Sequence, residues 1–196
     1  MSKNQKSPLK DVKVLVLLSL MAALSILFGK YLAFPGGGDS MIRFSFENLP
    51  ILLAAMHFGP IAGIAVGVLA DLLGCLMVGY AINPLITLGA AVIGLFGGVC
   101  IRILPKKMPR PLRILISVAA AHLFGSVLVK TFGLAAYYDM PLYLLMLWRL
   151  LNYTIITALE CALICLIVKN PAIARQLHAF NKRSALLLSD KERKEQ

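Results

Sequence analysis

Charged residues, and acidic residues above all, are scarce in this sequence. They make up 15% of its 196 residues, with nine Asp and Glu against 20 Lys and Arg, whereas soluble domains carry about a quarter charged residues. Hydrophobic residues make up 59% of the chain and stand in long blocks along it. This composition excludes a water-soluble domain of this size and indicates an integral membrane protein.

The common motifs of catalysis and metal binding are also missing. The chain has no GxxxxGKS/T phosphate-binding loop, no HExxH or GxSxG motif and no paired-carboxylate metal motif, so it offers neither its own ATPase nor a recognisable catalytic centre. Its four cysteines lie in apolar stretches without CxxC spacing, which indicates neither a disulfide framework nor a zinc site. We expect a protein that is not an enzyme and binds no cofactor or metal itself.

The excess of basic residues has a topological explanation. Juxtamembrane clusters of Lys and Arg mark the cytoplasmic side of a membrane, so the net charge of +11 calls for no nucleic-acid partner. Sixteen of the 20 basic residues lie in the N-terminal segment, one loop and the C-terminal tail: Lys3, Lys6, Lys10, Lys13; Arg102, Lys106, Lys107, Arg110, Arg113; Lys169, Arg175, Lys182, Arg183, Lys191, Arg193 and Lys194.

Six apolar segments, separated by turn signals rich in Gly and Pro, predict six membrane spans. They run at about 12 to 33, 46 to 58, 60 to 79, 82 to 104, 111 to 136 and 141 to 168. A perpendicular span needs about 20 residues, so we expect the short second segment to be tilted, partly re-entrant or packed inside the bundle. An even number of spans places both basic termini and the basic loop on the cytoplasmic side.

The predicted fold is therefore an all-α integral membrane bundle of six transmembrane helices with both termini cytoplasmic. We expect residues 12 to 169 to form this domain, after a cytoplasmic segment at 1 to 11 and before a basic cytoplasmic tail at 170 to 196 that forms a short surface helix. Among the outer loops, the one at 34 to 45 is the longest and the richest in glycine, which is typical of a flexible lid.

Four basic residues fall outside the cytoplasmic clusters: Lys30, Arg43, Lys130 and Arg149. The topology places them in the outer half of the protein together with four acids, Asp39, Glu47, Asp71 and Asp139. Because charged groups within a membrane generally face a cavity or a partner, we predict an outward-facing polar pocket.

The individual charges each have a second interpretation. Arg149 shares one helical face with Asn152 and Tyr153, or it snorkels to the outer interface beside Trp148; Lys130, near the end of its span, has the same alternative. Asp71 lies deep in its span, where it contacts a ligand or bonds a neighbouring helix to fix packing. In the inner half, Glu160 is better suited to packing or coupling than to ligand contact.

Small residues mark faces where helices approach closely. Ser19 and Ala23 stand four positions apart on the first span, and so do Ser25, Gly29 and Ala33. Such faces serve either contacts within the bundle or contacts with another protein. The glycines of the fourth span allow the same two interpretations: Gly89, Gly94, Gly97 and Gly98.

Three neighbouring stretches carry a resemblance to a known family: IRFSFENLPI at 42 to 51, FGPIAG at 58 to 63 and GVLADLLG at 67 to 74. Together with PLITL at 84 to 88 and RLLN at 149 to 152, they resemble the substrate-binding S-components of energy-coupling factor (ECF) transporters. Within that group the chain most resembles the folate-specific members. The resemblance covers residues from about 12 to 170.

The resemblance implies a six-helix protein of the bacterial cell membrane that captures folate with high affinity at the outer face, beneath the loop joining the first two helices. Such a subunit docks on one transmembrane coupling protein and two ABC ATPases, which use ATP to drive delivery of the ligand inward. Family members usually carry an AxxxA docking motif on the first helix. This sequence offers Ser19 and Ala23 at that spacing instead.

Folate chemistry then suggests roles for the outer residues. Amides and carboxylates of Asp71, Asn48 or Asn152 suit the donor and acceptor edge of the pterin, and Glu47 belongs to the same predicted site. Arg43 and Arg149 suit the carboxylates of the glutamate tail. Aromatic residues on which the ring would stack are Phe44, Tyr80, Tyr137 and Trp148.

Three other functions remain open at this point. The first is an S-component for another vitamin or small aromatic substrate. The second is a membrane-embedded enzyme acting on a lipid or isoprenoid, with Asp71 and either Glu47 or His57 binding a metal. The third is a scaffold subunit without a ligand, which would not need an outer polar pocket.

Overall fold

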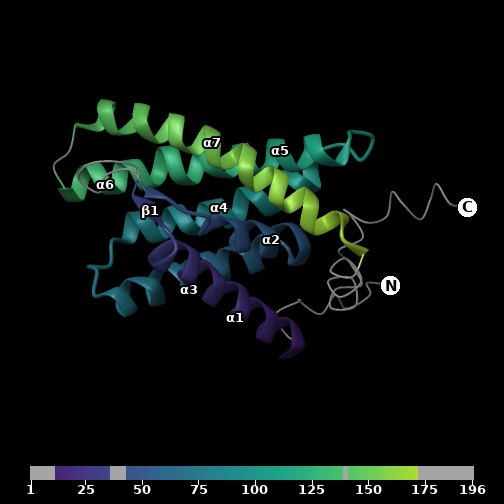
Figure 1. Cartoon of the computed structure of the whole chain (residues 1–196), viewed down its shortest axis with the longest axis horizontal. Coiled ribbons are helices and arrows are strands. Elements are labelled where there is room, and N and C mark those ends of the chain that lie inside the picture. The colour runs from purple at the N-terminus through teal and green to yellow at the C-terminus, as the bar shows by residue number, and fades with distance from the viewer. Residues whose placement is uncertain (1–11, 36–42, 139–140, 172–196) are drawn as a thin grey trace, which may run out of the picture.

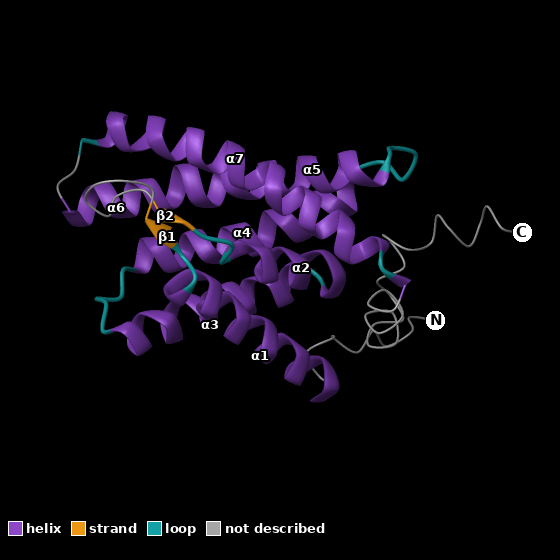
Figure 2. Cartoon of the chain, viewed as in Figure 1, coloured by secondary structure: helices purple, strands orange, loops and turns teal. Residues whose placement is uncertain are grey.

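The computed structural model describes residues 12–35, 43–138 and 141–171. Within these residues the chain forms a bundle of helices with one short strand pair (Figure 1 and Figure 2). The elements are α1 (Val12–Ile26), a π-helical turn η2 (Leu27–Tyr31), strands β1 (Phe34–Pro35) and β2 (Arg43–Phe44), α2 (Asn48–Phe58), α3 (Pro60–Val78), α4 (Pro84–Ile103), α5 (Arg110–Ala121), the π-helix η3 (His122–Val129), α6 (Lys130–Tyr138) and α7 (Leu142–Lys169).

The predicted helical membrane bundle is confirmed. Because η2 continues α1, and η3 joins α5 to α6 without a break, five helical segments are long and apolar enough to cross a membrane: Val14–Tyr31, Pro60–Val78, Pro84–Ile103, Arg110–Tyr137 and Leu142–Lys169. The sixth, α2, has only 11 residues. The segment boundaries lie within a few residues of those predicted from hydropathy.

The turns follow from the residues between the helices. Gly59 has a φ of 118°, a backbone angle that side chains resist, and it reverses the chain between α2 and α3 directly before Pro60 at the first position of α3. Gly79 ends α3 in the left-handed conformation. The Asn83 side chain accepts a hydrogen bond from the Leu85 backbone N–H at 3.0 Å and caps the start of α4.

The two ends of the bundle differ in charge. The start of α1, the turn between α4 and α5 and the end of α7 lie at one end, which we call the basic end, and the turn between α3 and α4 lies at the opposite end (Figure 1). The basic end carries Lys106, Lys107 and Lys169. That this end faces the cytoplasm stays a prediction from the charge pattern.

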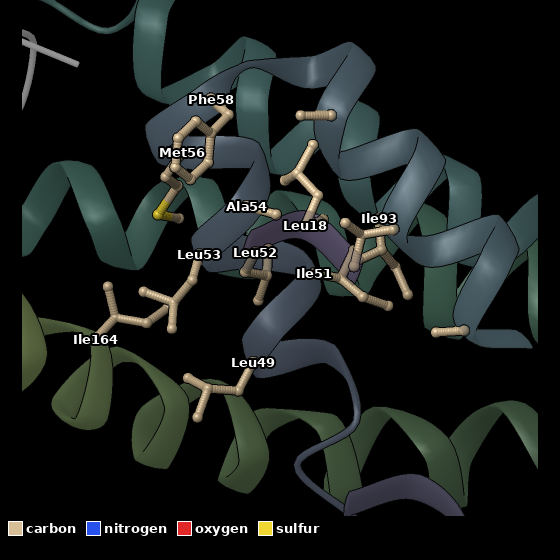
Figure 3. Packing of buried hydrophobic residues seen from close by; sticks show 14 of the residues in the cluster. Leu18, Leu49, Ile51, Leu52, Leu53, Ala54, Met56, Phe58, Ile93 and Ile164 are labelled. Atoms are coloured by element: carbon tan, nitrogen blue, oxygen red, sulfur yellow. The ribbon is translucent and has the colours of Figure 1, made fainter. Parts of the chain in front are cut away.

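Helix α2 forms the centre of the bundle, so the second segment is packed inside, one of the three arrangements expected for it. All 11 of its residues are buried, and a short helix with no exposed face is stabilised by its neighbours rather than by its own length. Figure 3 shows its side chains within the apolar core: Leu49, Ile51, Leu52, Leu53, Ala54, Met56 and Phe58 from α2, with Leu18 of α1, Ile93 of α4 and Ile164 of α7.

Glycines of α4 allow neighbouring backbones to approach closely, so these positions serve contacts within the bundle. A Cβ added at Gly63 of α3 would lie 2.9 Å from Cα of Gly94, and one at Gly98 would lie 2.7 Å from the backbone of Pro60. A Cβ at Gly97 would lie 2.7 Å from the Leu52 side chain of α2. In lipid there is no hydrophobic driving force between helices, so the close van der Waals packing that small residues allow stabilises such crossings.

The loop between α1 and α2 departs from an all-helical description. Phe34 pairs with Phe44 and Pro35 with Arg43 in a two-residue antiparallel ribbon, so the ends of the predicted lid are held together. The Gly-rich part at 36–42, including Asp39, lies outside the described residues, as do Asp139, the segment 1–11 and the tail from 172 onward.

The contact between α3 and α4 gives a first prediction. Gly94→Val places a branched side chain against the backbone of Gly63, so we expect the helices to separate and the free energy of unfolding to fall by about 1 to 3 kcal/mol or more. Thermal unfolding in detergent measures this change. Leu95→Val, at the neighbouring half-exposed position, is the control, and equal melting temperatures for the two variants would contradict the packing argument.

Candidate ligand-binding site

A small polar cavity lies in the half of the bundle away from the basic end. Lys30 stands one residue before the end of η2, and Thr87, which bonds Asp71 of the cavity wall, lies in the first turn of α4. The site therefore lies near the helix ends that are opposite the basic end. The cavity and the open space at its mouth together occupy about 280 Å³. Its lining comes from η2, α1, the loop before α2, α2, α3, α4 and α6: Ser25, Ile26, Gly29, Lys30, Glu47, Ile51, Gly67, Ala70, Asp71, Ala90 and Lys130.

An ion pair crosses this cavity. Lys130 Nζ at the start of α6 donates to Glu47 Oε1 just before α2 at 2.8 Å. Lys130 is only 5% exposed, so the snorkelling alternative for this residue is wrong. The lysine turns inward because the carboxylate offsets the cost of burying its charge.

Two glycines make room for the ion pair. A Cβ at Gly29 would lie 2.7 Å from Glu47 Oε2, and a Cβ at Gly89 would collide with Cγ of Lys130. Ser25 Oγ donates to the backbone oxygen of Glu47 at 2.6 Å and ties the start of α2 to α1. The position of the carboxylate is therefore determined by residues from three separate segments.

Asp71 combines both interpretations of the sequence. Thr87 Oγ1 donates to Asp71 Oδ2 at 2.6 Å, so the aspartate joins α3 to α4 as the packing interpretation requires. It also lines the cavity. The second oxygen of the carboxylate retains its capacity to accept hydrogen bonds from a bound molecule.

Lys30 is the second cation of the cavity. Its ammonium lies 3.9 Å from Cys75 Sγ and 5.4 Å from the ring centre of Tyr80, and no salt bridge holds it within the described part of the chain. Its stem packs on Gly74, where a Cβ would lie 2.9 Å from Cε of the lysine. A buried stem and an uncompensated head group make Lys30 available to an anion.

Arg149 of α7 is the third cation near the site. Its Nη2 donates to the Tyr153 hydroxyl at 3.4 Å and its guanidinium lies 5.3 Å from the Tyr153 ring centre. The charges of Lys130, Lys30 and Arg149 all act on the Glu47 carboxylate. Three cations therefore act near two acids, Glu47 and Asp71, and the single positive charge in excess favours a further negative charge at the site.

Two buried asparagines flank the same region. Asn48, the first residue of α2, is fully buried, and among the described residues neither its amide nitrogen nor its amide oxygen has a hydrogen-bond partner. Buried polar groups are normally hydrogen-bonded, so the predicted ligand role of this amide stays a prediction that its missing partners support. Asn152 is 8% exposed and lies on the same side of α7 as Arg149 and Tyr153.

Other residues of the predicted site lie apart from the cavity lining. Tyr137 and Trp148 are about half exposed. Tyr80 is connected to the site by the contact between its ring and the Lys30 ammonium. Phe44 is half-buried on β2, whereas of Arg43 only the backbone is described. The roles assigned to these residues from the sequence stay predictions.

Sequence reasoning missed some of the cavity-forming residues. Thr87, Ser25 and Gly29 look like ordinary residues of apolar helices, and only the packing of α1, α3 and α4 brings them to the cavity. Lys30 and Lys130 were identified as unexplained charges but assigned no ligand role. Their position outside the basic clusters was the signal that pointed to the cavity.

The predicted docking residues lie on the outer surface of α1. Ser19 and Ala23 are both exposed, and the Ser19 hydroxyl donates to the Leu15 carbonyl within the helix. Their face of α1 is thus available to lipid or to another protein.

A multi-pass membrane protein with a polar cavity inside its bundle is the class that this fold and site define. The sequence profile of the family described as "ECF transporter, substrate-specific component" matches residues 13–172. The chain belongs to this family, which confirms the resemblance seen in the sequence. It is accordingly a substrate-specific component of a transporter.

Two solved structures have a similar fold. One is described as FolT bound with folic acid, with 22% sequence identity and a TM-score of 0.63 over 78% of this chain and 90% of that one. The other is described as the S component of a bacterial ECF transporter, with 20% identity and a TM-score of 0.57 over 80% and 97% of the two chains. A comparison with curated protein sequences finds no significant match.

The Lys130–Glu47 ion pair gives a second prediction. Lys130→Met leaves a carboxylate without its partner, so we expect the free energy of unfolding to fall by about 3 kcal/mol, the low end for a buried pair, because the Glu47 side chain is 28% exposed. Thermal unfolding in detergent is the measurement. The double variant Lys130→Met with Glu47→Gln should recover most of the loss, and additive losses would show that the two charges are not coupled.

Proposed function

We propose that this chain is the high-affinity folate-binding subunit of an ECF-type importer. Membership of the substrate-specific component family supports the transport role, and the fold shared with the folic acid complex of FolT supports the choice of ligand. The observation that carries the proposal is the polar cavity within an apolar bundle, where Lys30 has no salt-bridge partner among the described residues and the buried Asn48 amide, next to Glu47 in the chain, has no hydrogen-bond partner among them.

The cations match the acidic end of folate. Its glutamate tail carries two carboxylates, and charge-assisted hydrogen bonds to Lys and Arg are among the stronger contacts available to them. Lys30 and Arg149 are the candidates, since Lys130 is already paired with Glu47. Arg43 in the loop is a further candidate from the sequence.

The pterin offers a planar edge of donors and acceptors. Asn48 has a donor group and an acceptor without partners among the described residues, and Asp71 in the cavity wall has spare acceptor capacity. Such groups give specificity because an incorrect ligand leaves them unsatisfied in a dry site. Asn152 would add a second amide from α7.

The cavity must widen to admit this ligand. Sites for molecules of this kind usually enclose about 300 to 1,000 Å³, whereas the space here is only about 280 Å³ even with the open space at its mouth included, so the enclosed part is smaller still. The loop between α1 and α2 bears on the site directly, because Glu47 at its end lines the cavity. We therefore propose that this loop acts as a lid at the outer face.

Transport requires partners that this chain does not supply. We propose docking through the exposed face of α1 at Ser19 and Ala23 onto a transmembrane coupling protein, with two ABC ATPases that use ATP to drive inward release. We propose that the chain lies in the bacterial cell membrane with both termini in the cytoplasm, which the basic residues near both ends of the sequence support. The alternative enzyme would hold a metal between Asp71 and either His57 or Glu47. His57 lies at the far end of α2 from the cavity, beside the Leu53 carbonyl, and Glu47 lines the cavity with Asp71 but is paired with Lys130.

Calorimetric titration of the purified protein with folic acid tests the ligand. We expect tight one-to-one binding of folic acid and none of riboflavin or thiamine, because only folate places a flat donor edge and two carboxylates on one molecule. Binding of another vitamin by folded protein would reassign the substrate within the same family. Absence of binding to all three would overturn the folate proposal.

The docking surface gives a separate prediction. Ala23→Trp adds a bulky ring to an exposed helix face that lies away from the cavity lining, so folate affinity should stay within about twofold, while uptake in cells expressing the whole transporter should be lost. The matched control is Leu20→Trp, which changes a neighbouring exposed position. Normal uptake by the Ala23 variant would refute docking through this residue.

A further inference from the structure

A second buried polar cluster lies between η3 and α7, nearer to the basic end than the cavity is. His122 at the start of η3 and Glu160 of α7 are joined by a hydrogen bond of 2.7 Å between Nε2 and Oε2. The two residues are 2% and 0% exposed. On the other side of the imidazole, Nδ1 lies 3.2 Å from the Ser126 hydroxyl, so both ring nitrogens are held.

The imidazole is also stacked on the ring of Tyr153. The ring centres are 5.0 Å apart with an interplanar angle of 30°. Tyr153 in turn accepts the hydrogen bond from Arg149 and lies under its guanidinium. Glu160, His122, Tyr153 and Arg149 therefore form one continuous series of contacts.

The spacing along α7 makes this series possible. Arg149, Tyr153 and Glu160 stand at i, i+4 and i+11, which places all three on one helical face. The upper end of the series, at Arg149, reaches the ligand site, because the positive charge of Arg149 acts on the Glu47 carboxylate in the cavity wall. Its lower end lies about 16 Å further along the helix, at 1.5 Å per residue.

A purely structural role explains this cluster poorly. Within a membrane bundle a carboxylate and an imidazole are expensive to bury, and an apolar pair of similar volume packs at least as well. Furthermore, the second oxygen of Glu160 has no hydrogen-bond partner among the described residues. A cluster kept at this cost is expected to serve the function of the protein.

We propose that His122 and Glu160 are positioning residues for Arg149. Glu160 fixes the orientation of the imidazole, the imidazole fixes the plane of Tyr153, and Tyr153 holds the guanidinium toward the cavity for a carboxylate of the ligand. Preorganising a long arginine in this way lowers the entropy lost on binding. The inference rests on the proposed function, since it assigns Arg149 to the acidic tail of folate.

Variants of Glu160 separate positioning from packing. Glu160→Leu removes the acceptor but suits the apolar bundle, so the protein should fold, which a thermal melt checks. We expect its affinity for folic acid to fall about tenfold, with little change for pteroic acid, which lacks the glutamate tail. Glu160→Gln keeps an acceptor for His122 and should stay within about twofold of the wild type for both ligands.

A double-mutant cycle with Arg149→Ala tests the connection. If Glu160 acts through Arg149, Glu160→Leu should cause no further loss of folate affinity once Arg149 is absent. Thr154→Val, on the exposed side of α7, is the matched control and should change neither affinity. His122→Phe with Glu160→Leu offers a second apolar variant of the pair, and it should show the same selective loss.

The outcomes distinguish this inference from the proposed function. Three results would overturn the positioning role alone, provided that the wild-type protein binds folic acid. In Glu160→Leu, the affinities for folic and pteroic acid fall equally, or neither falls. In the double-mutant cycle, the affinity losses of Glu160→Leu and Arg149→Ala are fully additive. Wild-type protein that fails to bind folic acid overturns the proposed function, and the positioning role with it.

Discussion

The ion pair between Lys130 and Glu47 joins α6 to the start of α2, and the cavity is built around it. A lysine at this depth is tolerable only with a carboxylate at hydrogen-bond distance, here 2.8 Å away. The carboxylate in turn needs Gly29 to leave space and Ser25 to hold its backbone. Pairing therefore determines how the loop enters the bundle and where α2 begins.

Helix α2 depends on apolar packing rather than on an ion pair, because it carries almost no polar groups and is buried on every side. Small residues of α3 and α4 let the surrounding backbones close around it, with Gly97 against Leu52 and Gly94 against Gly63. The amide of Asn48 at its first residue, which has no hydrogen-bond partner in the described part of the chain, is the exception. Apolar packing thus holds the helix in place without help from this polar end.

Much of the fold could be predicted from the sequence, since long apolar runs and their Gly and Pro breaks determine helices in lipid. A polar pocket could also be predicted, because charges outside the basic clusters require partners, and the structure has one away from the basic end. That this pocket faces outward stays a prediction. The choice of residues was less successful. The snorkelling alternative for Lys130 was wrong, and Thr87 and Ser25 were not recognised as part of the site, because hydropathy does not reveal which faces of α1, α4 and α6 meet.

The sequence by itself determined the membrane class, the number and limits of the helical segments and the family, because these depend on composition, periodicity and short motifs local in the chain. Only the tertiary structure decided which charges pair, that α2 lies inside the bundle, and that Glu160, His122, Tyr153 and Arg149 form one series of contacts. These features depend on distances between side chains up to 83 positions apart. Such distances are determined by how the helices pack, and no local pattern in the sequence records them.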